Sequence, residues 1–395
     1  MSISPGEHLT YSIGPRGSLR LRDALSKYFN EHFCPSTQVA ADNLYVTPGL
    51  ASCIDSIAWA LCDPDDGILI PRPYYNGFTV DITHRSHVQV VGVDYADISR
   101  HSSMNDLFRP EINTEALEAA LSKSKTRGIN IRALLISQPH NPLGRCYPPE
   151  TLKAFLGFCS RHQIHLISDE IYAKSVFQNP SMADPTPFTS VMAVSNGLID
   201  PLLLHVMYGA SKDFCANGLR LGVLYTQNQG AMLTELVKSR QFAWSPHLVQ
   251  DIWATMLNDK KWLDTFFTLN HELMAKNHSI ATAFFQSHKI DYFESNAGVF
   301  IWVDLGRYML PQRFRSQGHS SRLRSNMSEA DLVACIESES RLAATCIECG
   351  VMISPGSIYA SEEFGWYRVT FTLPEAALRE GLHRMGKALE FSVQE

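Results

Sequence analysis

The segment YGASKDFCANGLRLG, residues 208–222, contains a lysine that could act as a nucleophile and an arginine that could bind an anion. An apolar run leads to Lys212, and Arg220 follows eight residues later, between Gly218 and Gly222. Burial disfavours a charged ammonium, so it lowers the pKa of a lysine and makes the amine a nucleophile toward carbonyl groups. A guanidinium nearby can bind a phosphate dianion through its planar fork. The plainer interpretation of Lys212 is a solvated residue at the end of a strand.

A carboxylate and a phenol end a second apolar run, HLISDEIY, residues 165–172. Ligands of open α/β sheets bind at the carboxyl ends of the strands. A buried Asp169 at such an end would need a cationic partner, for which a protonated pyridine nitrogen qualifies. Tyr172 could donate a hydrogen bond to a phenolate oxygen of the same ligand. The alternative for Asp169 is a cap on the following helix.

An amide and an aromatic ring lie in two further turns. Asn141 stands before a proline in SQPHNPLGR, residues 137–145, and its amide can donate a hydrogen bond from this turn. Tyr75, in PRPYYNGF, residues 71–78, offers a flat face that could stack on an aromatic ring. A loop tyrosine of this kind can also be ordinary packing.

A glycine turn between a strand and a helix is expected in VTPGLASCIDSIAWAL, residues 46–61. The first N–H groups of a helix have no partner within the helix, and they commonly bind phosphate. The backbone amides that would open this helix belong to Gly49, Leu50 and Ala51.

Taken in order, these motifs resemble the pyridoxal-phosphate enzymes of fold type I, the class I/II aminotransferase family. The resemblance extends from about residue 11 to about residue 385. Within the family, the motif sequences are most similar to those of the group that includes 1-aminocyclopropane-1-carboxylate synthase. The segments that carry this similarity are PYYNGF, PLGRCY, SDEIYAKSVF, YGASKDF and GWYRVTF.

The resemblance implies a role for each polar residue around the cofactor, pyridoxal 5′-phosphate. Lys212 would bond covalently to the cofactor aldehyde and, once released, would carry the proton between the substrate Cα and the cofactor. Asp169 would pair with the pyridinium nitrogen and keep the cofactor an electron sink. Asn141 and Tyr172 would bind the phenolate oxygen, and Tyr75 would stack on the ring. The phosphate would be held by Ser211, Arg220 and the backbone amides of residues 49–51.

The same resemblance separates catalysis from substrate binding. The catalytic residues that the resemblance implies are Lys212, Asp169 and Tyr172. Arg368, in WYRVTF, matches the arginine that grips the α-carboxylate of an amino-acid substrate, and Asn141 belongs to the same predicted substrate site. The other interpretation of Arg368 is an exposed strand arginine.

Tyr11, in YSIGPRG, resembles the tyrosine that reaches the cofactor phosphate of the partner subunit, so a homodimer is implied. The chain departs from the family at two hydroxyl positions, where Gly209 and Ala51 stand. Phosphate binding is therefore expected to depend more on Arg220 and on backbone amides. Family members usually have some tens of residues before the position of Tyr11, and these help to form the substrate pocket. No substrate side chain is therefore assigned.

Three functions are compatible with these residues. The first is an aminotransferase, which binds an α-amino acid as an external aldimine and removes its Cα proton. The second is a lyase that starts with the same proton removal and then loses a leaving group from Cβ or Cγ. It would be of the carbon–sulfur β-elimination or the aminocyclopropane-carboxylate-synthase type. The third is a non-catalytic protein that binds pyridoxal phosphate.

The motifs lie at the ends of short apolar runs that alternate with segments of helical periodicity, such as residues 148–163. Alternation of this kind predicts an α/β fold, with a mostly parallel sheet sandwiched by helices. A helix-rich segment at 228–290 and two later apolar runs predict a smaller α+β domain. The runs expected to be strands are 67–71, 88–93, 133–139, 165–170, 202–209, 219–226, 298–305 and 366–374.

Three segments are expected to divide between two domains. Residues 39–270 would form the large domain that binds the cofactor, and residues 271–395 the smaller C-terminal domain. Residues 1–38 would be an N-terminal part of the smaller domain, with a helix at 17–33 packed in it. The arginine- and serine-rich segment 311–329 is expected to be a solvated, mobile loop, with an active-site lid as the alternative.

Composition argues against several other classes of protein. The 395 residues include 34 Lys and Arg against 40 Asp and Glu, and the net charge of −6 is not that of a nucleic-acid binder. No apolar run approaches the ~20 residues of a membrane span, and the N-terminus does not resemble a signal peptide. The nine cysteines are expected to be reduced thiols of a cytoplasmic protein. No metal site is expected, because the CxxC at 346–349 has no second pair at zinc spacing.

Overall fold

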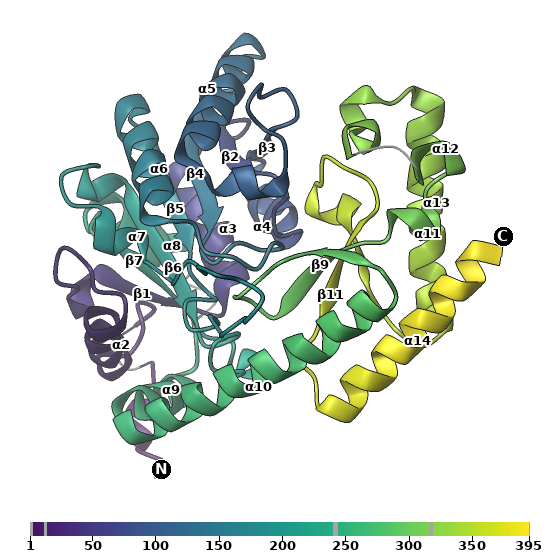
Figure 1. The fold of residues 1–395 in the computed structure, drawn as a ribbon. Coiled ribbons are helices and arrows are strands. Elements are labelled where there is room, and N and C mark those ends of the chain that lie inside the picture. Colours follow the sequence, from purple (N-terminus) through teal and green to yellow (C-terminus); the bar gives the residue numbers. More distant parts are fainter. Residues whose placement is uncertain (1–2, 12–13, 240–243, 316–318, 395) are drawn as a thin grey trace.

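Two β-sheets organise the chain in the computed structural model, which describes residues 3–11, 14–239, 244–315 and 319–394 (Figure 1). The larger sheet has seven strands and the smaller has four among these residues. The long helix α10 (Lys260–Ser287) runs between the two parts of the molecule. The larger sheet is mostly parallel and is flanked by helices, which confirms the expected α/β fold.

The larger sheet contains one strand that runs against all the others. β7 is antiparallel to both of its neighbours, β1 and β6. The chain passes from β6 to β7 through the loop at 210–221 without a crossover helix, and parallel strands need such a crossover. In the order in which they lie side by side, the strands are β1 (Leu44–Thr47), β7 (Gly222–Thr226), β6 (Leu204–Gly209), β5 (His165–Asp169), β4 (Ile131–Ser137), β2 (Gly67–Pro71) and β3 (Gln89–Val93).

Both faces of the larger sheet are covered, so its central strands are apolar on both sides. On neighbouring positions of β5, Leu166 belongs to one core and Ile167 to the other. Helices α2, α5, α6 and α9 contribute to the core of Leu166, and α3, α4 and α8 to that of Ile167. The bounds of these helices are α2 (Leu19–His32), α3 (Leu50–Leu61), α4 (Gly77–Ser86), α5 (Pro110–Thr126), α6 (Pro149–His162), α8 (Ala231–Ser239) and α9 (His247–Asn258).

Helix α6 shows how the sequence produces these helices. Pro149 occupies its first position, where a missing N–H leaves no hydrogen bond unmade. Leu152, Phe155 and Cys159 recur at helical spacing and are fully buried against the sheet. The helix ends where Gln163 adopts a left-handed conformation with φ of 53°.

The smaller sheet is antiparallel, with β9 and β11 at its centre. Ile301 and Val303 of β9 share a core with apolar residues of α10, α13 and α14. None of the helices in the described residues is long and apolar enough to cross a membrane. The remaining strands and α-helices of the described residues are β8 (Asp291–Phe293), β9 (Phe300–Asp304), β10 (Ser354–Pro355), β11 (Trp366–Thr370), α13 (Glu329–Glu348), α14 (Glu375–Gln394) and the short helices α1 (Pro5–His8), α7 (Val191–Val194), α11 (Gly306–Met309) and α12 (Gln312–Arg315).

The helix expected at 17–33 forms as α2, but it packs against the larger sheet and not against the smaller one. Leu21, Leu25 and Phe29 are buried on this helix, in the same core as Tyr208 of β6. Helix α2 also contacts α9 and the 3₁₀ helix Ala41–Asn43. The expectation was wrong because helical periodicity identifies an apolar face without identifying the surface that covers it.

Part of the segment 311–329 is folded against the smaller sheet, so the expectation of a solvated loop was wrong for that part. Arg322 is buried, and its Nη1 lies 2.7 Å from Oδ2 of Asp304 on β9. Arginine and serine content indicated exposure, whereas the burial of this guanidinium depends on a carboxylate 18 positions away. Residues 316–318 of the segment lie outside the described residues.

Replacing Arg322 with alanine should lower the free energy of unfolding by about 3–5 kcal/mol, because Asp304 would keep a buried charge without its partner. Chemical denaturation measures this loss. Arg100→Ala is the control, since the Arg100–Glu115 pair is exposed and should contribute less than about 1 kcal/mol. Equal effects of the two variants would contradict the importance of the buried pair.

Candidate active site

A cavity of about 290 Å³ lies at the carboxyl ends of β4, β5 and β6. We call it the Asp169 cavity. Ligands of open α/β sheets bind at this edge, because the strand-to-helix turns meet there. The structure brings most of the predicted site residues together around the cavity: Leu50, Ala51, Tyr75, Asn141, Asp169, Tyr172, Ser211, Lys212 and Arg220.

Lys212 stands in the turn that follows β6, directly after Ser211. The surrounding protein partly desolvates its ammonium group and thereby lowers its pKa. The positive charges of Arg368 and Arg220 lower this pKa further, and the charge of Asp169 acts in the opposite direction. The uncharged amine, which is the form that attacks a carbonyl carbon, is therefore more populated than in an ordinary lysine.

Asp169 is the last residue of β5 and is 7% exposed. Burial raises the pKa of its carboxyl group to about 7, although the N–H of Ile171 donates to Oδ1 at 3.1 Å and Lys212 supplies a positive charge. A buried carboxylate stays ionised only when a cation compensates it. The cavity therefore offers an acidic group that would gain from a cationic ligand atom.

A guanidinium and a helix N-terminus converge in the wall of the Asp169 cavity. Gly49, with φ of 87°, precedes the first turn of α3, and a Cβ added at Gly49 would collide with the Arg220 guanidinium. Arg220 donates from Nη1 to the backbone oxygen of Asn217 at 3.0 Å. The N–H of Gly49 donates to the backbone oxygen of Thr47 at 2.8 Å, so the amides that can face a phosphate are those that follow it in the first turn of α3. The start of a helix and a cation in such proximity form a site for a phosphate.

Arg368 reaches this region from β11 of the smaller sheet. Its Nη1 donates to Oδ1 of Asn141 at 3.1 Å. The guanidinium carbon lies 4.9 Å from the ring centre of Phe300 and 4.8 Å from that of Tyr359. Its Nε is buried without a hydrogen-bond partner among the described residues. The side chain is thus held in place while keeping donor capacity for a carboxylate.

Two tyrosines provide the remaining predicted contacts. Tyr172 is buried, and desolvation raises the pKa of its hydroxyl, so the group stays protonated and can donate. Its ring packs edge-on against Phe300, with ring centres 5.5 Å apart. Tyr75 is half-buried in the wall of the Asp169 cavity, and desolvation raises the pKa of its hydroxyl too.

Tyr11 does not join this cavity. Its side chain is 82% exposed, and its ring packs against Trp244 with ring centres 5.4 Å apart. The predicted role of Tyr11 toward a partner subunit, and with it the homodimer, stays a prediction.

Several residues of the site escaped the sequence reasoning. Ile171 stands between two predicted residues, and Ser137 ends β4, so strand ends alone could have indicated both. Asp81 lies within α4, where its carboxyl group is partly desolvated and the pKa is raised. Tyr359 contacts Arg368 from the chain after β10, and nothing local in its sequence indicates this. The other cavity residues that were missed are Ile54 and Asn217.

The sequence of nearly the whole chain matches a known family. The sequence model of the family described as aminotransferase class I and II matches residues 5–385. The chain belongs to this family. The aminotransferase class I and II proteins depend on pyridoxal phosphate, and so does this protein.

Individual relatives carry two kinds of name. A 1-aminocyclopropane-1-carboxylate synthase-like protein 1 of Mus musculus is 32% identical over 377 residues, which are 95% of this chain and 68% of the relative. A probable aminotransferase of Aspergillus oryzae is 31% identical over 386 residues, 97% of this chain and 83% of the relative. The solved aromatic aminotransferase of Pyrococcus horikoshii has a TM-score of 0.76 at 17% identity, covering 96% of this chain and 88% of that one. This last similarity shows the fold alone.

The donor set of the Asp169 cavity fits pyridoxal phosphate. Asp169 offers a buried negative charge for the ring nitrogen, and Lys212 offers an amine for the aldehyde. Arg220 and the start of α3 offer donors for the phosphate dianion. Tyr172 offers a hydroxyl donor for the phenolate oxygen. Each charged or polar group of the cofactor thus finds a complementary group of the chain.

Asp169→Asn should stabilise the cofactor-free protein relative to the parent, and increasingly so between about pH 4 and about pH 7. The reason is that folding raises the pKa of Asp169 from 3.8 to about 7. Between these two pH values the unfolded parent releases the proton whereas the folded parent retains it, so the stability of the parent falls over this interval and the difference then levels off. Thermal unfolding of both proteins across the pH range measures the difference. A difference that does not change with pH would contradict the raised pKa.

Proposed function

We propose that the protein is an aminotransferase that binds an α-amino acid and removes its Cα proton with Lys212. The observation that carries this proposal is the hydrogen bond between Arg368 Nη1 and Asn141 Oδ1, at 3.1 Å. It brings a guanidinium of the smaller sheet to the cavity that Lys212 lines. The carboxylate and the amine of an α-amino acid share one carbon, so their binding groups must lie close together.

The residues of the chain would divide the reaction between them. Arg368 would bind the α-carboxylate through two parallel hydrogen bonds. Lys212 would take the proton from Cα and return it at the next step. Because Asn141 accepts from Arg368 through Oδ1, its NH₂ group remains as the donor for the phenolate oxygen. Pyridoxal phosphate, when bound, supplies the electron sink that stabilises the carbanion.

A second candidate is a lyase that begins with the same proton removal. The motifs PYYNGF and YGASKDF support it by their similarity to the aminocyclopropane-carboxylate-synthase group. The name of the mouse relative agrees with that similarity. In this case a leaving group departs from Cβ or Cγ, in a carbon–sulfur β-elimination or a ring-forming elimination. Both reactions need the same residues around Cα, so they differ in the product and not in the site.

Incubation of the holoenzyme with a panel of L-amino acids tests the proposal. Transfer should convert a supplied 2-oxo acid into its amino acid, whereas β-elimination should release a 2-oxo acid with no acceptor present. A ring-forming elimination should instead release the leaving group and a cyclic amino acid, with no 2-oxo acid. Lys212→Ala should lose either activity, and borohydride should fix the cofactor to Lys212 in the parent. Lys238→Ala, at an exposed ion pair with Glu235, is the control and should retain both properties. Bound cofactor without turnover of any amino acid would indicate the non-catalytic alternative.

Arg368→Gln should raise the KM for amino acids on the order of 10- to 100-fold, because a charge-assisted hydrogen bond contributes about 1.5–3 kcal/mol. The affinity for the cofactor should change much less. Steady-state kinetics and cofactor titration measure the two effects. Arg100→Gln, which alters an exposed ion pair, provides the control. An unchanged KM would remove Arg368 from the substrate site.

A further inference from the structure

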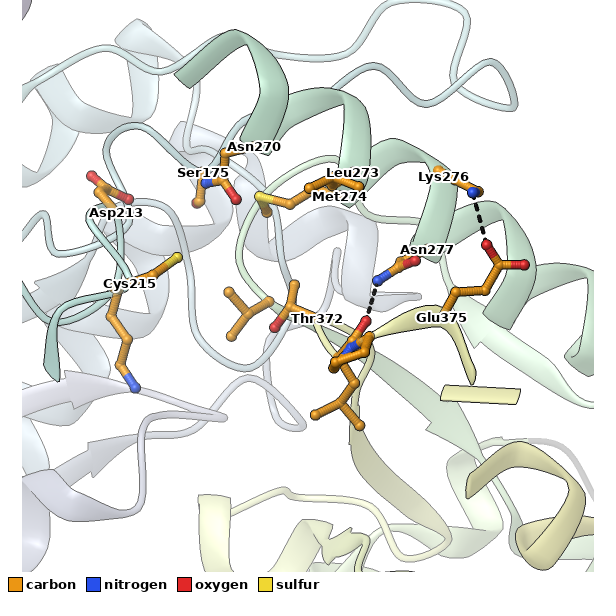
Figure 2. Close-up of a pocket in the computed structure, with 14 residues that line it drawn as sticks. Ser175, Asp213, Cys215, Asn270, Leu273, Met274, Lys276, Asn277, Thr372 and Glu375 are labelled. Carbon is orange, nitrogen blue, oxygen red and sulfur yellow. Dashed lines mark hydrogen bonds and ion pairs between the residues drawn. The ribbon is translucent and has the colours of Figure 1, made fainter. Parts of the chain in front are cut away.

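A second cavity has a volume of about 390 Å³, and Lys212 is one of the residues that line it. Figure 2 shows side chains that form its walls. We call this cavity the α10 cavity. It lies between the loop that follows β6, the middle of α10 and the turn at 372–375 that leads into α14. Lys212 lines both this cavity and the Asp169 cavity. Its volume lies within the range of about 300–1,000 Å³ that is typical of small-molecule sites.

Apolar side chains form much of the α10 cavity. Leu273 and Met274 contribute from α10, and Leu373 contributes from the turn before α14. Val299 also lines it and directly precedes Phe300, whose ring centre lies 4.9 Å from the Arg368 guanidinium carbon. Val299 packs against the cluster of Ile171, Tyr172 and Phe300, so the α10 cavity borders this cluster through Val299.

The shape of the α10 cavity is fixed by contacts between its walls. Asn277 of α10 is buried, and its Nδ2 donates to the backbone oxygens of Leu373 at 2.7 Å and Phe371 at 3.3 Å. Lys276 pairs with Glu375 at 2.7 Å on the same side, opposite the wall that Cys215 forms (Figure 2). Helix α10 and the turn at 372–375 are therefore tied together at two points.

We propose that the α10 cavity receives the side chain of the amino-acid substrate and favours a large, uncharged, apolar side chain. This inference rests on the proposed function. When Arg368 binds the α-carboxylate and Lys212 faces the Cα hydrogen, the substrate side chain extends from Cα between these two residues. The α10 cavity shares Lys212 with the Asp169 cavity, and its Val299 packs against the cluster that contains Phe300, over which Arg368 lies.

The charges of the α10 cavity select against acidic side chains. Its lysine on α10, Lys276, already pairs with Glu375. A substrate carboxylate at this end would lie near a second negative charge and would lose hydration without gaining an unpaired cation there. A benzyl group, in contrast, would replace water against Leu273, Met274 and Leu373.

Binding of three carboxylates that lack an amine and cannot react tests the inference on the holoenzyme. The probes are 3-phenylpropionate, propionate and succinate, which carry the side chains of phenylalanine, alanine and aspartate. Equilibrium dialysis should give a Kd for 3-phenylpropionate at least tenfold below that of either other probe. This measurement needs no turnover, so it remains decisive if neither transfer nor elimination is detected.

Leu273→Phe is designed to fill the α10 cavity from α10, and Thr372→Phe from the opposite turn. Each should raise the Kd of 3-phenylpropionate about tenfold or more and leave that of propionate within about twofold. Leu269→Phe is the matched control, one helical turn earlier on α10 and 54% exposed, as against 58% for Leu273. Leu269 does not line the α10 cavity, and the substitution is chemically identical.

The outcomes separate the two proposals. Selective loss of 3-phenylpropionate binding in both filling variants, with the control unchanged, supports the side-chain site. An unchanged ratio of the two Kd values in both filling variants, or tighter binding of succinate than of 3-phenylpropionate, overturns it. Failure of the amino-acid panel to react, with these binding differences intact, would contradict the proposed reaction and leave the side-chain site standing.

Discussion

The buried carboxylate of Asp169 sets the electrostatic requirement of the whole site. Burial raises its pKa to about 7, so its ionised form is costly until a cation compensates it. The positive charge of Lys212 compensates the Asp169 carboxylate only in part, because desolvation lowers the pKa of that lysine as well. A ligand with a protonated ring nitrogen removes the cost directly. The cofactor is therefore bound through the pairing of its ring nitrogen with Asp169 as well as through its phosphate.

Lys212 is positioned by a polar network behind it. The next residue, Asp213, is buried and accepts hydrogen bonds at Oδ2 from the Tyr208 hydroxyl at 2.9 Å and the Lys174 N–H at 2.8 Å. The hydroxyl of Tyr208 lies 3.2 Å from that of Tyr28 on α2. The turn that carries Lys212 is thus joined to β6 and to the N-terminal helix. This network gives a physical reason for α2 to pack on the larger sheet.

Local sequence patterns predicted the parts of the site that lie at strand ends. Lys212, Asp169 and Asn141 each follow an apolar run, and parallel strands bring their carboxyl ends to one edge. The contacts of Arg322 with Asp304, and of Tyr359 with Arg368, could not be predicted in this way. They depend on which surfaces of the folded chain meet, and side-chain periodicity carries no information about that. The packing of α2 escaped prediction for the same reason.

In the proposed reaction, proton transfer and substrate recognition would fall to residues from different sheets, and the substrate would connect them. Lys212 follows β6 of the larger sheet and Arg368 lies on β11 of the smaller, and Asn141, which follows β4 of the larger sheet, accepts a hydrogen bond from Arg368. A substrate held at its carboxylate by Arg368 and at its side chain by α10 is oriented by groups that take no part in proton transfer. Binding energy from these remote contacts can then fix the Cα–H bond toward Lys212, where misplacement by about 1 Å can cost on the order of 100-fold in rate. Selectivity for the side chain and speed of proton transfer would consequently change together when the α10 cavity changes.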